Sequence, residues 1–438
     1  MAAPVITVFE YGYLSCEVDE HRCSRIPVRA FSYLEALCLN QSEDTPAFLR
    51  LCSFRGHKAL QVRNYVGVIH TPAGVQIEVL PKTSSDGQQS EEEARSALLN
   101  MLRHLRAFRH IETADALVAA KHMPLLEVFI RQFLESVNRL VKRGLRSEYV
   151  RREGNQTFMK GKLLASQQLK HNLVNQHRFY VAYDEYLQDR PVNRLLHTAL
   201  VRVANYAKSN ANQKLCRELS FAFKDVPLSK NIRQDFAAMK MSRGMDYYKS
   251  PLAWARLILE GFSPLSMHGK DDAVSLLFPM EAVFEAYVAS ILRNQLKPPY
   301  SLKEQASSEY LVDYGTSRWF RLKPDLMILK GKEVAHVLDT KWKLLDSSKD
   351  NGTDKLGLAQ SDFYQMFAYG HKYCRSQGEM MLIYPRTGQF SEPLPQSFDF
   401  SRELKLWVVP FDVSCGTADS KRLYLPEHHD RQFLSQSE

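Results

Sequence analysis

Residues 318–329 read RWFRLKPDLMIL and residues 334–342 read VAHVLDTKW, and these two stretches decide the fold of the chain. Both are rich in aliphatic, β-branched or aromatic residues, so each predicts a strand, with Pro324-Asp325 inside the first one. The connection between them, residues 330–333 (KGKE), is short enough for a hairpin. The sequence therefore predicts two paired strands that carry charged residues.

Three charged residues of this hairpin are expected to meet at one point. Asp339 and Lys341 are two positions apart, so they project from the same face of a strand, and Asp325 on the paired strand can reach that face. Carboxylate oxygens are natural ligands for Mg²⁺, which lowers the pKa of a bound water in phosphodiester hydrolysis. The predicted metal site contains Asp325, Asp339 and Thr340, which follows Asp339, and Lys341 is predicted to hold the attacking water. Two ordinary salt bridges are the alternative.

This pattern resembles the signature of PD-(D/E)xK nucleases, and the preceding segment adds a candidate. Residues 280–296 predict an amphipathic helix. In this nuclease fold, a helix before the strands commonly offers a glutamate to the metal site. Glu285 is the candidate, Glu281 is its local competitor, and a solvent-facing helix glutamate is the alternative.

The following segment predicts a second helix of the same core. Within residues 362–369 (DFYQMFAY), Gln365 and Tyr369 are four positions apart and share a helix face. The pair resembles the QxxxY motif of RecB-like nucleases, in which the amide can orient a phosphate or a water; core packing is the alternative for Tyr369. Predicted strands at 379–384 and 404–409 complete an order of helix, three strands, helix and strands.

The first 80 residues predict mainly strands. Residues 65–70 (YVGVIH) and 75–80 (VQIEVL) predict a hairpin around the turn 71–74 (TPAG). The polar stretch 83–89 that follows is typical of a linker.

Helices are expected to follow this linker. Ser90, with Glu93 three residues later, caps a helix predicted to reach about Arg109, and apolar residues at helical spacing predict another helix that ends at Gly144. The expected fold class is multidomain α/β. Its predicted parts are a β-rich partner-docking domain (1–85), a helical region that contacts DNA or a partner (90–265), an endonuclease domain with a mixed sheet flanked by helices (275–415) and a tail (416–438).

Length and composition exclude several classes of protein. A chain of 438 residues predicts two or three domains, and its 45% hydrophobic and 24% charged residues exclude disorder and fibrous folds. No apolar run approaches the roughly 20 residues of a membrane span, and the N-terminus lacks the pattern of a secretory signal. The seven cysteines form no CxxC pair and are typical of buried thiols in a reducing compartment. We therefore expect a cytoplasmic protein with no membrane partner.

The positive charge is concentrated in one window. The formal net charge is +9, and residues 139–162 hold eight basic residues against two acidic ones. Such a window is expected to contact DNA phosphates, and a solvated helix end and loop is the alternative. The predicted DNA-binding residues are Arg143, Arg146, Arg151, Arg152, Lys160 and Lys162.

The chain as a whole resembles the McrC family, the nuclease subunits of McrBC-type modification-dependent restriction systems. The resemblance spans roughly residues 60–412, and the ordered series of matching segments is more specific than any one motif. These segments are VGVI (66–69) with IEVLPK (77–82), FLESVNRLVKRGLRSEY (133–149), KGKL (160–163), FYVAYDEYLQDRPVN (179–193), MEAVFE (280–285) and residues 362–369.

The resemblance implies a division of labour between two proteins. The chain would carry the Mg²⁺-dependent nuclease and cut double-stranded DNA, with methylcytosine as the expected modification. An McrB-like AAA+ hexamer would hydrolyse GTP, and this chain would stimulate that hydrolysis. The chain contains no GxxxxGK[ST] loop, so we expect the partner and not this chain to bind the nucleotide.

Two other functions remain open. One is a stand-alone repair nuclease, and the other is a non-catalytic regulator that stimulates a partner NTPase. Retention of Asp325, Asp339 and Lys341 argues against the regulator. The pair His428-His429 is interpreted as part of a solvated tail and not as a metal site.

Overall fold

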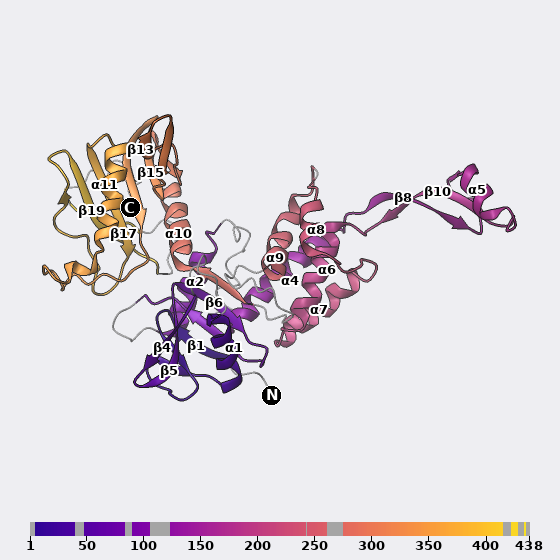
Figure 1. Cartoon of the computed structure of the whole chain (residues 1–438), viewed down its shortest axis with the longest axis horizontal. Coiled ribbons are helices and arrows are strands. Elements are labelled where there is room, and N and C mark those ends of the chain that lie inside the picture. The colour runs from indigo at the N-terminus through magenta and orange to yellow at the C-terminus, as the bar shows by residue number, and fades with distance from the viewer. Residues whose placement is uncertain are drawn as a thin grey trace. The chain divides into compact units, whose positions relative to one another are not determined.

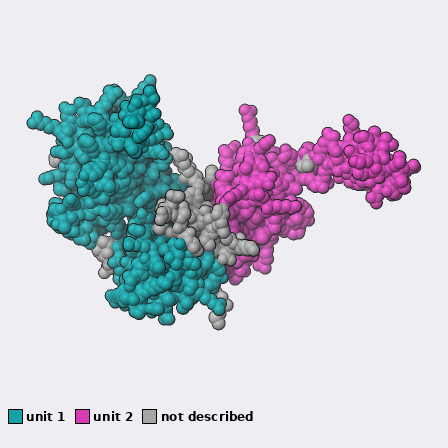
Figure 2. All heavy atoms as spheres, in the orientation of Figure 1, with its two compact units in different colours: residues 1–125, 262–438 teal, residues 126–261 magenta. Residues whose placement is uncertain are grey.

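The computed structural model describes residues 5–39, 48–83, 90–105, 123–241, 243–260, 275–414, 422–427 and 433–434. The chain forms two units, coloured separately in Figure 2: unit 1 contains residues 1–125 and 262–438, and unit 2 contains residues 126–261. Both units combine helices and strands, so the predicted mixed α/β class is confirmed. None of the described helices is long and apolar enough to cross a membrane.

The N-terminal part of unit 1 contains two four-stranded sheets and helix α1 (Val28–Leu39). One sheet has the order β1-β7-β6-β11, with strands at Val5–Phe9, Gln76–Leu80, Tyr65–His70 and Leu276–Pro279. The other has the order β3-β2-β5-β4, with strands at Cys23–Arg25, Tyr13–Ser15, His57–Val62 and Leu49–Phe54. Apolar side chains from both sheets and α1 share one core.

The predicted hairpin of β6 and β7 is confirmed, and a glycine explains how a distant strand joins it. Gly74 in the connecting turn has φ +80°, a value that favours glycine. In β6, Gly67 has φ +131°, and a Cβ at this position would lie 1.9 Å from the carbonyl oxygen of Leu276. Only a glycine therefore lets β11 pair with β6 at this point.

Helix α2 (Glu91–Leu102) begins as predicted and ends earlier. The side chain of Ser90 accepts hydrogen bonds from the backbone of Glu92 and Glu93. The prediction that the helix reaches about Arg109 is corrected, because the bonding switches to tighter turns, in which His104 donates to the carbonyl of Met101. Residues 106–109 lie outside the described residues.

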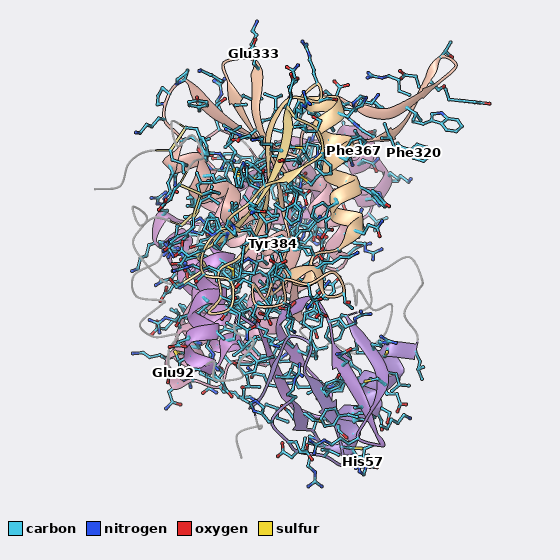
Figure 3. All side chains as sticks on the ribbon, turned by 90° about the vertical axis from the view of Figure 1, so that its left-hand side faces the viewer. His57, Glu92, Phe320, Glu333, Phe367 and Tyr384 are labelled. Atoms are coloured by element: carbon cyan, nitrogen blue, oxygen red, sulfur yellow. The ribbon has the colours of Figure 1, made fainter. Side chains whose placement is uncertain are left out.

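The C-terminal part of unit 1 contains a six-stranded sheet of order β12-β15-β16-β17-β19-β18. Its strands lie at Tyr300–Glu304, Leu326–Lys330, Glu333–Thr340, Gly378–Pro385, Leu404–Phe411 and Phe398–Asp399. Helix α10 (Met280–Gln295) precedes the sheet, and α11 (Gln360–Tyr373) connects the parallel strands β16 and β17, with a short helix η3 (Lys355–Gly357) before it. Tyr384 of β17 is fully buried in this core, whereas Glu333 lies at the outer end of β16 (Figure 3).

One strand predicted from the sequence is in fact two strands. Strand β14 (Ser317–Arg321) pairs with β13 (Tyr310–Tyr314) in a separate ribbon, and β15 starts only at Leu326. Pro324-Asp325 lies in the break and not inside a strand, since proline has no N–H to donate to a ladder. The predicted hairpin of β15 and β16 is present, with Gly331 at φ +65° in its turn.

Unit 2 combines a group of helices with a long two-stranded ribbon (Figure 1). The helices are α4 (Leu125–Arg143), α6 (Pro191–Ala204), α7 (Asn210–Ala222), α8 (Ile232–Ala238), η2 (Asp246–Tyr248) and α9 (Lys249–Glu260). The ribbon pairs β8 (Glu148–Gln156) with β10 (Phe179–Leu187), and β9 (Lys162–Leu163) and α5 (Ala165–Asn172) lie near its far end. We call residues 148–187 the arm.

The arm and α2 depart from the mostly helical region expected over residues 90–265. The arm adds three strands to that region, and α2 belongs to unit 1. The predicted end of α4 is correct, because Gly144 follows it with φ +91°.

Candidate active site

The end of β16 brings a buried carboxylate against a lysine. Asp339 is fully buried, and its Oδ2 lies 2.6 Å from Nζ of Lys341. The backbone N–H of Lys341 donates to the carbonyl of Ile383 on β17, so the extended geometry continues past Thr340. The two side chains therefore meet on one face, as their spacing predicted.

The break before β15 places Asp325 beside this pair. Its Oδ2 accepts hydrogen bonds from the backbone N–H and the hydroxyl of Thr340, both at 2.8 Å. The charge of Asp325 also acts on Asp339, whose pKa it helps to raise. The hydroxyl of Thr340 is thus used to hold Asp325 at the end of β16.

Helix α11 supplies Gln365 and Tyr369 to the same group. The Oε1 of Gln365 accepts a hydrogen bond from Lys341 Nζ at 3.0 Å, and its Nε2 donates to the Tyr369 hydroxyl at 2.7 Å and to Asp339 Oδ1 at 3.4 Å. Tyr369 in turn donates to the carbonyl of Lys323 at 2.9 Å. Both residues of the QxxxY pair therefore belong to one hydrogen-bonded chain that includes Lys341. We call Asp325, Asp339, Lys341, Gln365 and Tyr369 the Lys341 centre.

Burial and charge set the protonation of the central pair. Burial, together with the charge of Asp325, raises the pKa of Asp339 to about 7, although Lys341 opposes this rise. Burial alone would lower the pKa of Lys341, but the charge of Asp339 outweighs it, and the pKa of Lys341 lies above its usual value. Lys341 is therefore a cation at neutral pH, suited to holding an anion or a water and not to acting as a base.

The structure links Glu285 to the centre through a residue that the sequence did not single out. Gln305 donates from its side chain to Glu285 Oε1 at 3.1 Å and from its backbone N–H to the carbonyl of Asp325 at 2.8 Å. The competitor, Glu281, accepts a hydrogen bond from Asn64 of the N-terminal part at 3.4 Å. The helix glutamate connected to Asp325 is thus Glu285.

A further carboxylate, Asp362, was also missed as a site residue. Its Oδ1 lies 4.0 Å from Lys341 Nζ, and its Oδ2 accepts a hydrogen bond from the Tyr384 hydroxyl at 3.4 Å. Its position three residues before Gln365 places both on the same face of α11, and this spacing could have identified it.

The donor set of the centre fits a magnesium ion. Asp339 Oδ2 is buried, and although it contacts Lys341, it accepts no well-oriented hydrogen bond from the described residues. Mg²⁺ commonly takes one or two carboxylates and keeps several waters. Two carboxylates, Asp325 and Asp339, are available here, whereas no group of three or more His, Cys, Asp or Glu side chains within the described ranges is arranged to hold a metal.

The six predicted DNA-binding residues come from several elements of unit 2. Arg143 ends α4 and lies over the ring of Tyr247, Arg146 follows in the loop, and the other four lie on the arm. Two of those on the arm are partly neutralised, since Arg151 pairs with Glu153 at 3.3 Å and Arg152 with Glu185 at 2.9 Å. Lys160 lies 4.4 Å from the centre of the Tyr183 ring, and Lys162 is in β9.

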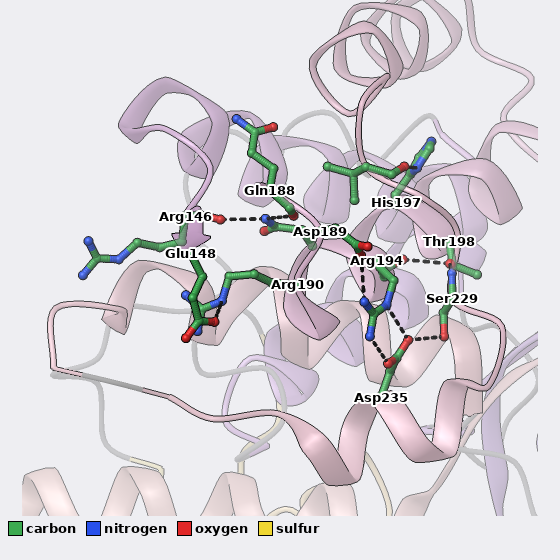
Figure 4. Close-up of polar contacts among 12 residues, drawn as sticks. Arg146, Glu148, Gln188, Asp189, Arg190, Arg194, His197, Thr198, Ser229 and Asp235 are labelled. Carbon is green, nitrogen blue, oxygen red and sulfur yellow. Dashed lines mark hydrogen bonds and ion pairs between the residues drawn. The ribbon is translucent and has the colours of Figure 1, made fainter. Parts of the chain in front are cut away.

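The segment 179–193 ends in a polar cluster of unit 2, drawn in Figure 4. Arg194 forms ion pairs with Asp189 at 2.7 Å and Asp235 at 2.6 Å. Asn193 donates to the carbonyls of Arg146 and Gln188 at 2.9 and 2.8 Å. These contacts hold the base of the arm against α6 and α8. We call Asp189, Arg194, Ser229 and Asp235 the Arg194 cluster.

Comparison with known proteins agrees with the resemblance seen in the sequence. The family described as McrBC 5-methylcytosine restriction system component matches residues 60–385. A half-complex of Thermococcus gammatolerans McrB AAA+ hexamers with bound McrC is similar in fold, with a TM-score of 0.68, 21% identity, and coverage of 93% of this chain and 95% of the other. The T. gammatolerans McrBC complex gives a TM-score of 0.50 at 20% identity, covering 66% of this chain and 87% of the other.

No curated protein matches the chain. The family match covers well over half of the residues, and the fold of the first solved structure extends over nearly all of them. The chain belongs to the McrC family of McrBC restriction-system components.

Proposed function

We propose that this protein is the Mg²⁺-dependent DNA endonuclease subunit of an McrBC-like restriction complex. The Lys341 centre carries the proposal, because a buried carboxylate that has no well-oriented donor among the described residues faces a lysine and a second carboxylate. Structural charge pairs are normally hydrogen-bonded when buried, and carboxylates with raised pKa values gather at functional sites.

Each residue of the centre has a proposed role. Asp325 and Asp339 hold the cation, with Thr340 fixing the orientation of Asp325. A bound Mg²⁺ would supply charge neutralisation at the phosphate and a more acidic water. Lys341 holds that water or a phosphate oxygen, and Gln365 keeps its ammonium group in position. Glu285 supports the site through Gln305.

We propose that an McrB-like AAA+ GTPase hexamer drives cleavage. Support comes from the similar solved structure, in which McrB AAA+ hexamers carry bound McrC, and from the absence of a phosphate-binding loop in this sequence. The family description names 5-methylcytosine, so methylated DNA is the proposed substrate. The chain is also proposed to accelerate the hydrolysis of GTP by its partner.

Two surfaces can dock this partner. The N-terminal sheets were expected to do so from the sequence. The arm is a second candidate, because large apolar side chains are exposed around its far end: Phe158, Met159, Leu169, Leu173 and Val174. Exposed apolar clusters of this kind mark interaction sites.

Point variants separate these two surfaces better than deletions do. Removing residues 1–85 would take away β6, the strand that pairs with β11, so it would damage unit 1 itself. We therefore propose two kinds of variant. Phe158→Ser and Val174→Ser change the arm, and Val28→Ser changes α1, where Val28 is 65% exposed. The surface whose variant reduces stimulation of the partner's GTP hydrolysis is the docking surface.

A mixing experiment tests the whole proposal. Cleavage of methylated double-stranded DNA should require this chain, the partner, GTP and Mg²⁺ together. Asp339→Ala or Lys341→Ala should abolish cleavage while folding and partner stimulation remain. Full cleavage by either variant, or undiminished cleavage in excess EDTA, would refute the nuclease assignment.

The two alternatives give different outcomes in the same experiment. Efficient cutting by this chain with Mg²⁺ alone would favour the stand-alone repair nuclease. Stimulated GTP hydrolysis without any cleavage would favour the non-catalytic regulator.

A further inference from the structure

A cavity of about 570 Å³ adjoins the Lys341 centre within unit 1. Lys341, Lys343 and Asp362 line it from the nuclease part, and Arg22 and Lys82 line it from the N-terminal part. Its volume lies in the range of roughly 300–1,000 Å³ that is usual for small-ligand sites. A cavity of this size can hold a small molecule or a short part of a larger one. The N-terminal sheets therefore contribute side chains to the edge of the candidate active site.

Three cations of this cavity have no close ion-pair partner in the part of the chain that the structure describes, although Glu281 and Asp362 also line it. Arg22, Lys82 and Lys343 form no ion pair with any of those residues. Burial lowers the pKa of Lys82, and the nearby charge of Arg22 lowers it further. Two cations that repel each other in a partly buried cavity favour the binding of an anion.

The acidic side chains that line the cavity offset only part of this charge. Glu281 and Asp362 are two carboxylates set against Arg22, Lys82, Lys341 and Lys343, and the third acidic residue, Glu10, is buried. Burial raises the pKa of Glu10 to about 8, so this group is mostly protonated at neutral pH. Its Oε2 accepts a hydrogen bond from Trp342 Nε1 at 2.7 Å, and Trp342 directly follows Lys341. Glu10 thus ties the end of β1 to the strand end that carries the lysine, and this contact keeps Arg22 and Lys82 beside the nuclease part.

We propose that this cavity binds a backbone phosphate of the DNA strand next to the phosphate that is cut, with Arg22, Lys82 and Lys343 as its contacts. The inference rests on the proposed nuclease function and extends it, because it gives the N-terminal sheets a direct part in positioning DNA. A phosphodiester fits better than a small free anion, because the cavity continues to Lys341 and is larger than one phosphate group needs.

The test measures DNA binding instead of cleavage. The full chain is titrated with a short DNA duplex in EDTA at several salt concentrations, and the log–log salt slope is compared among Arg22→Gln, Lys82→Gln, Lys343→Gln and the wild type. Each contact that is lost should weaken binding at any sequence and flatten the slope by about 0.9. Lys82→Arg keeps the charge and should keep most of the slope.

Lys332→Gln is the matched control, since Lys332 is exposed in the turn at the other end of β16. It should leave the slope unchanged. Lys343 is also exposed, so its substitution cannot act by unfolding the chain. Unchanged slopes in all three cavity variants, or slope changes as large in the control, would overturn the proposal.

Two further results distinguish the proposed DNA contact from the nuclease function and from a site for a small anion. If the complete wild-type complex does not cleave DNA, or Lys341→Ala cleaves at the full rate, but the cavity variants still flatten the slope, the DNA contact stands and the proposed function fails. Tight binding of inorganic phosphate that the cavity variants abolish, with DNA slopes unaffected, would reveal a small-anion site and refute the DNA contact.

Discussion

The Lys341 centre and the Arg194 cluster both bury carboxylates beside a cation, yet their chemistry differs. In the Arg194 cluster, Asp235 receives hydrogen bonds from Arg194 at 3.2 and 2.6 Å and from the Ser229 hydroxyl at 2.6 Å. Burial alone would raise the pKa of Asp235, but these hydrogen bonds lower it below its usual value. In the Lys341 centre, the pKa of Asp339 rises to about 7.

The difference distinguishes a group with a structural role from the proposed active site. Asp235 has its charge satisfied by a bidentate arginine, so nothing remains for a ligand to supply. Asp339 shares a small site with Asp325 and one lysine, and its Oδ2 has no well-oriented donor among the described residues. A cation would relieve the repulsion between the two carboxylates. The hydrogen bonds that each carboxylate receives, and not burial alone, therefore distinguish these two clusters.

The largest expected effect is the loss of cleavage in Lys341→Ala. We expect a decrease of at least about 10³-fold, the order seen when a group that stabilises transition-state charge is removed. Cleavage rates of the complete complex measure this effect. Lys332→Gln, far along the same hairpin, should cut at the wild-type rate. A Lys341→Ala variant that keeps more than a tenth of the wild-type cleavage rate would show that the Lys341 centre is not the site of cleavage.

Arg194→Ala should lower the stability of the protein and leave cleavage by the folded protein unchanged. It leaves Asp235 and Asp189 without their cation, and breaking a partly buried pair costs about 3–5 kcal/mol. Urea unfolding should report this loss of stability. The protein that remains folded should keep the Lys341 centre, which lies in the other unit. A stability within about 1 kcal/mol of the wild type, the worth of an ordinary surface pair, would argue against the structural role.

Gln365→Ala should reduce cleavage by an intermediate amount. The amide positions Lys341 and joins it to Tyr369, so we expect a decrease of about 10- to 100-fold, in the range of supporting groups around catalytic residues. Tyr369→Phe removes the hydroxyl that accepts from Gln365 and donates to Lys323, but it leaves the bond between Gln365 and Lys341 in place and should have a smaller effect. Equal losses in both variants would mean that the tyrosine contacts the substrate itself.

Glu10 allows the stability effect of an unsatisfied carboxyl to be measured apart from catalysis. Its folded pKa of about 8 lies above its unfolded value, so its contribution to stability is present below about pH 4.5 and is lost as the pH rises to about 8. Glu10→Gln keeps an acceptor for Trp342 and should stabilise the protein by about 1–3 kcal/mol at pH 9 but not at pH 4. Urea unfolding at the two pH values checks this. An equal effect at both would show that Glu10 does not titrate between them.

The smallest effect is expected from the paired arginines of the arm. If residues 139–162 contact DNA, each lost contact should flatten the salt slope by about one unit. Arg151 and Arg152 already pair with Glu153 and Glu185, so their substitution should change the slope less than substitution of Arg143 and Arg146. Fluorescence titration of the two double variants at three salt concentrations gives this order. The opposite order would show that DNA displaces the ion pairs.

The sequence predicted the parts of this site that depend on local spacing. The two-residue period placed Asp339 and Lys341 together, and the four-residue period placed Gln365 with Tyr369. It missed the strand break at Pro324, although that break allows Asp325 to bond with Thr340. A proline inside an otherwise apolar stretch was the available signal.

Contacts between distant segments were not predictable in the same way. Glu10 and Trp342 are 332 positions apart, so no periodicity relates them. The arm was missed because β8 and β10 are polar and lack a clear alternation, and each becomes a strand only by pairing with the other. Pairing partners of this kind are determined by the tertiary structure and cannot be predicted from the local pattern of a single sequence.

The fourth strand of the N-terminal sheet has a consequence for synthesis of the chain. Strand β11 comes roughly 200 residues after β6, and at about 5–20 residues per second the ribosome needs about 10–40 s to add them. Throughout that interval β6 is an unpaired, apolar edge, the kind of surface on which nascent chains aggregate. All of unit 2 is synthesised within this interval, before β11. Fragments that end before residue 279 would therefore leave this sheet without its complete fourth strand.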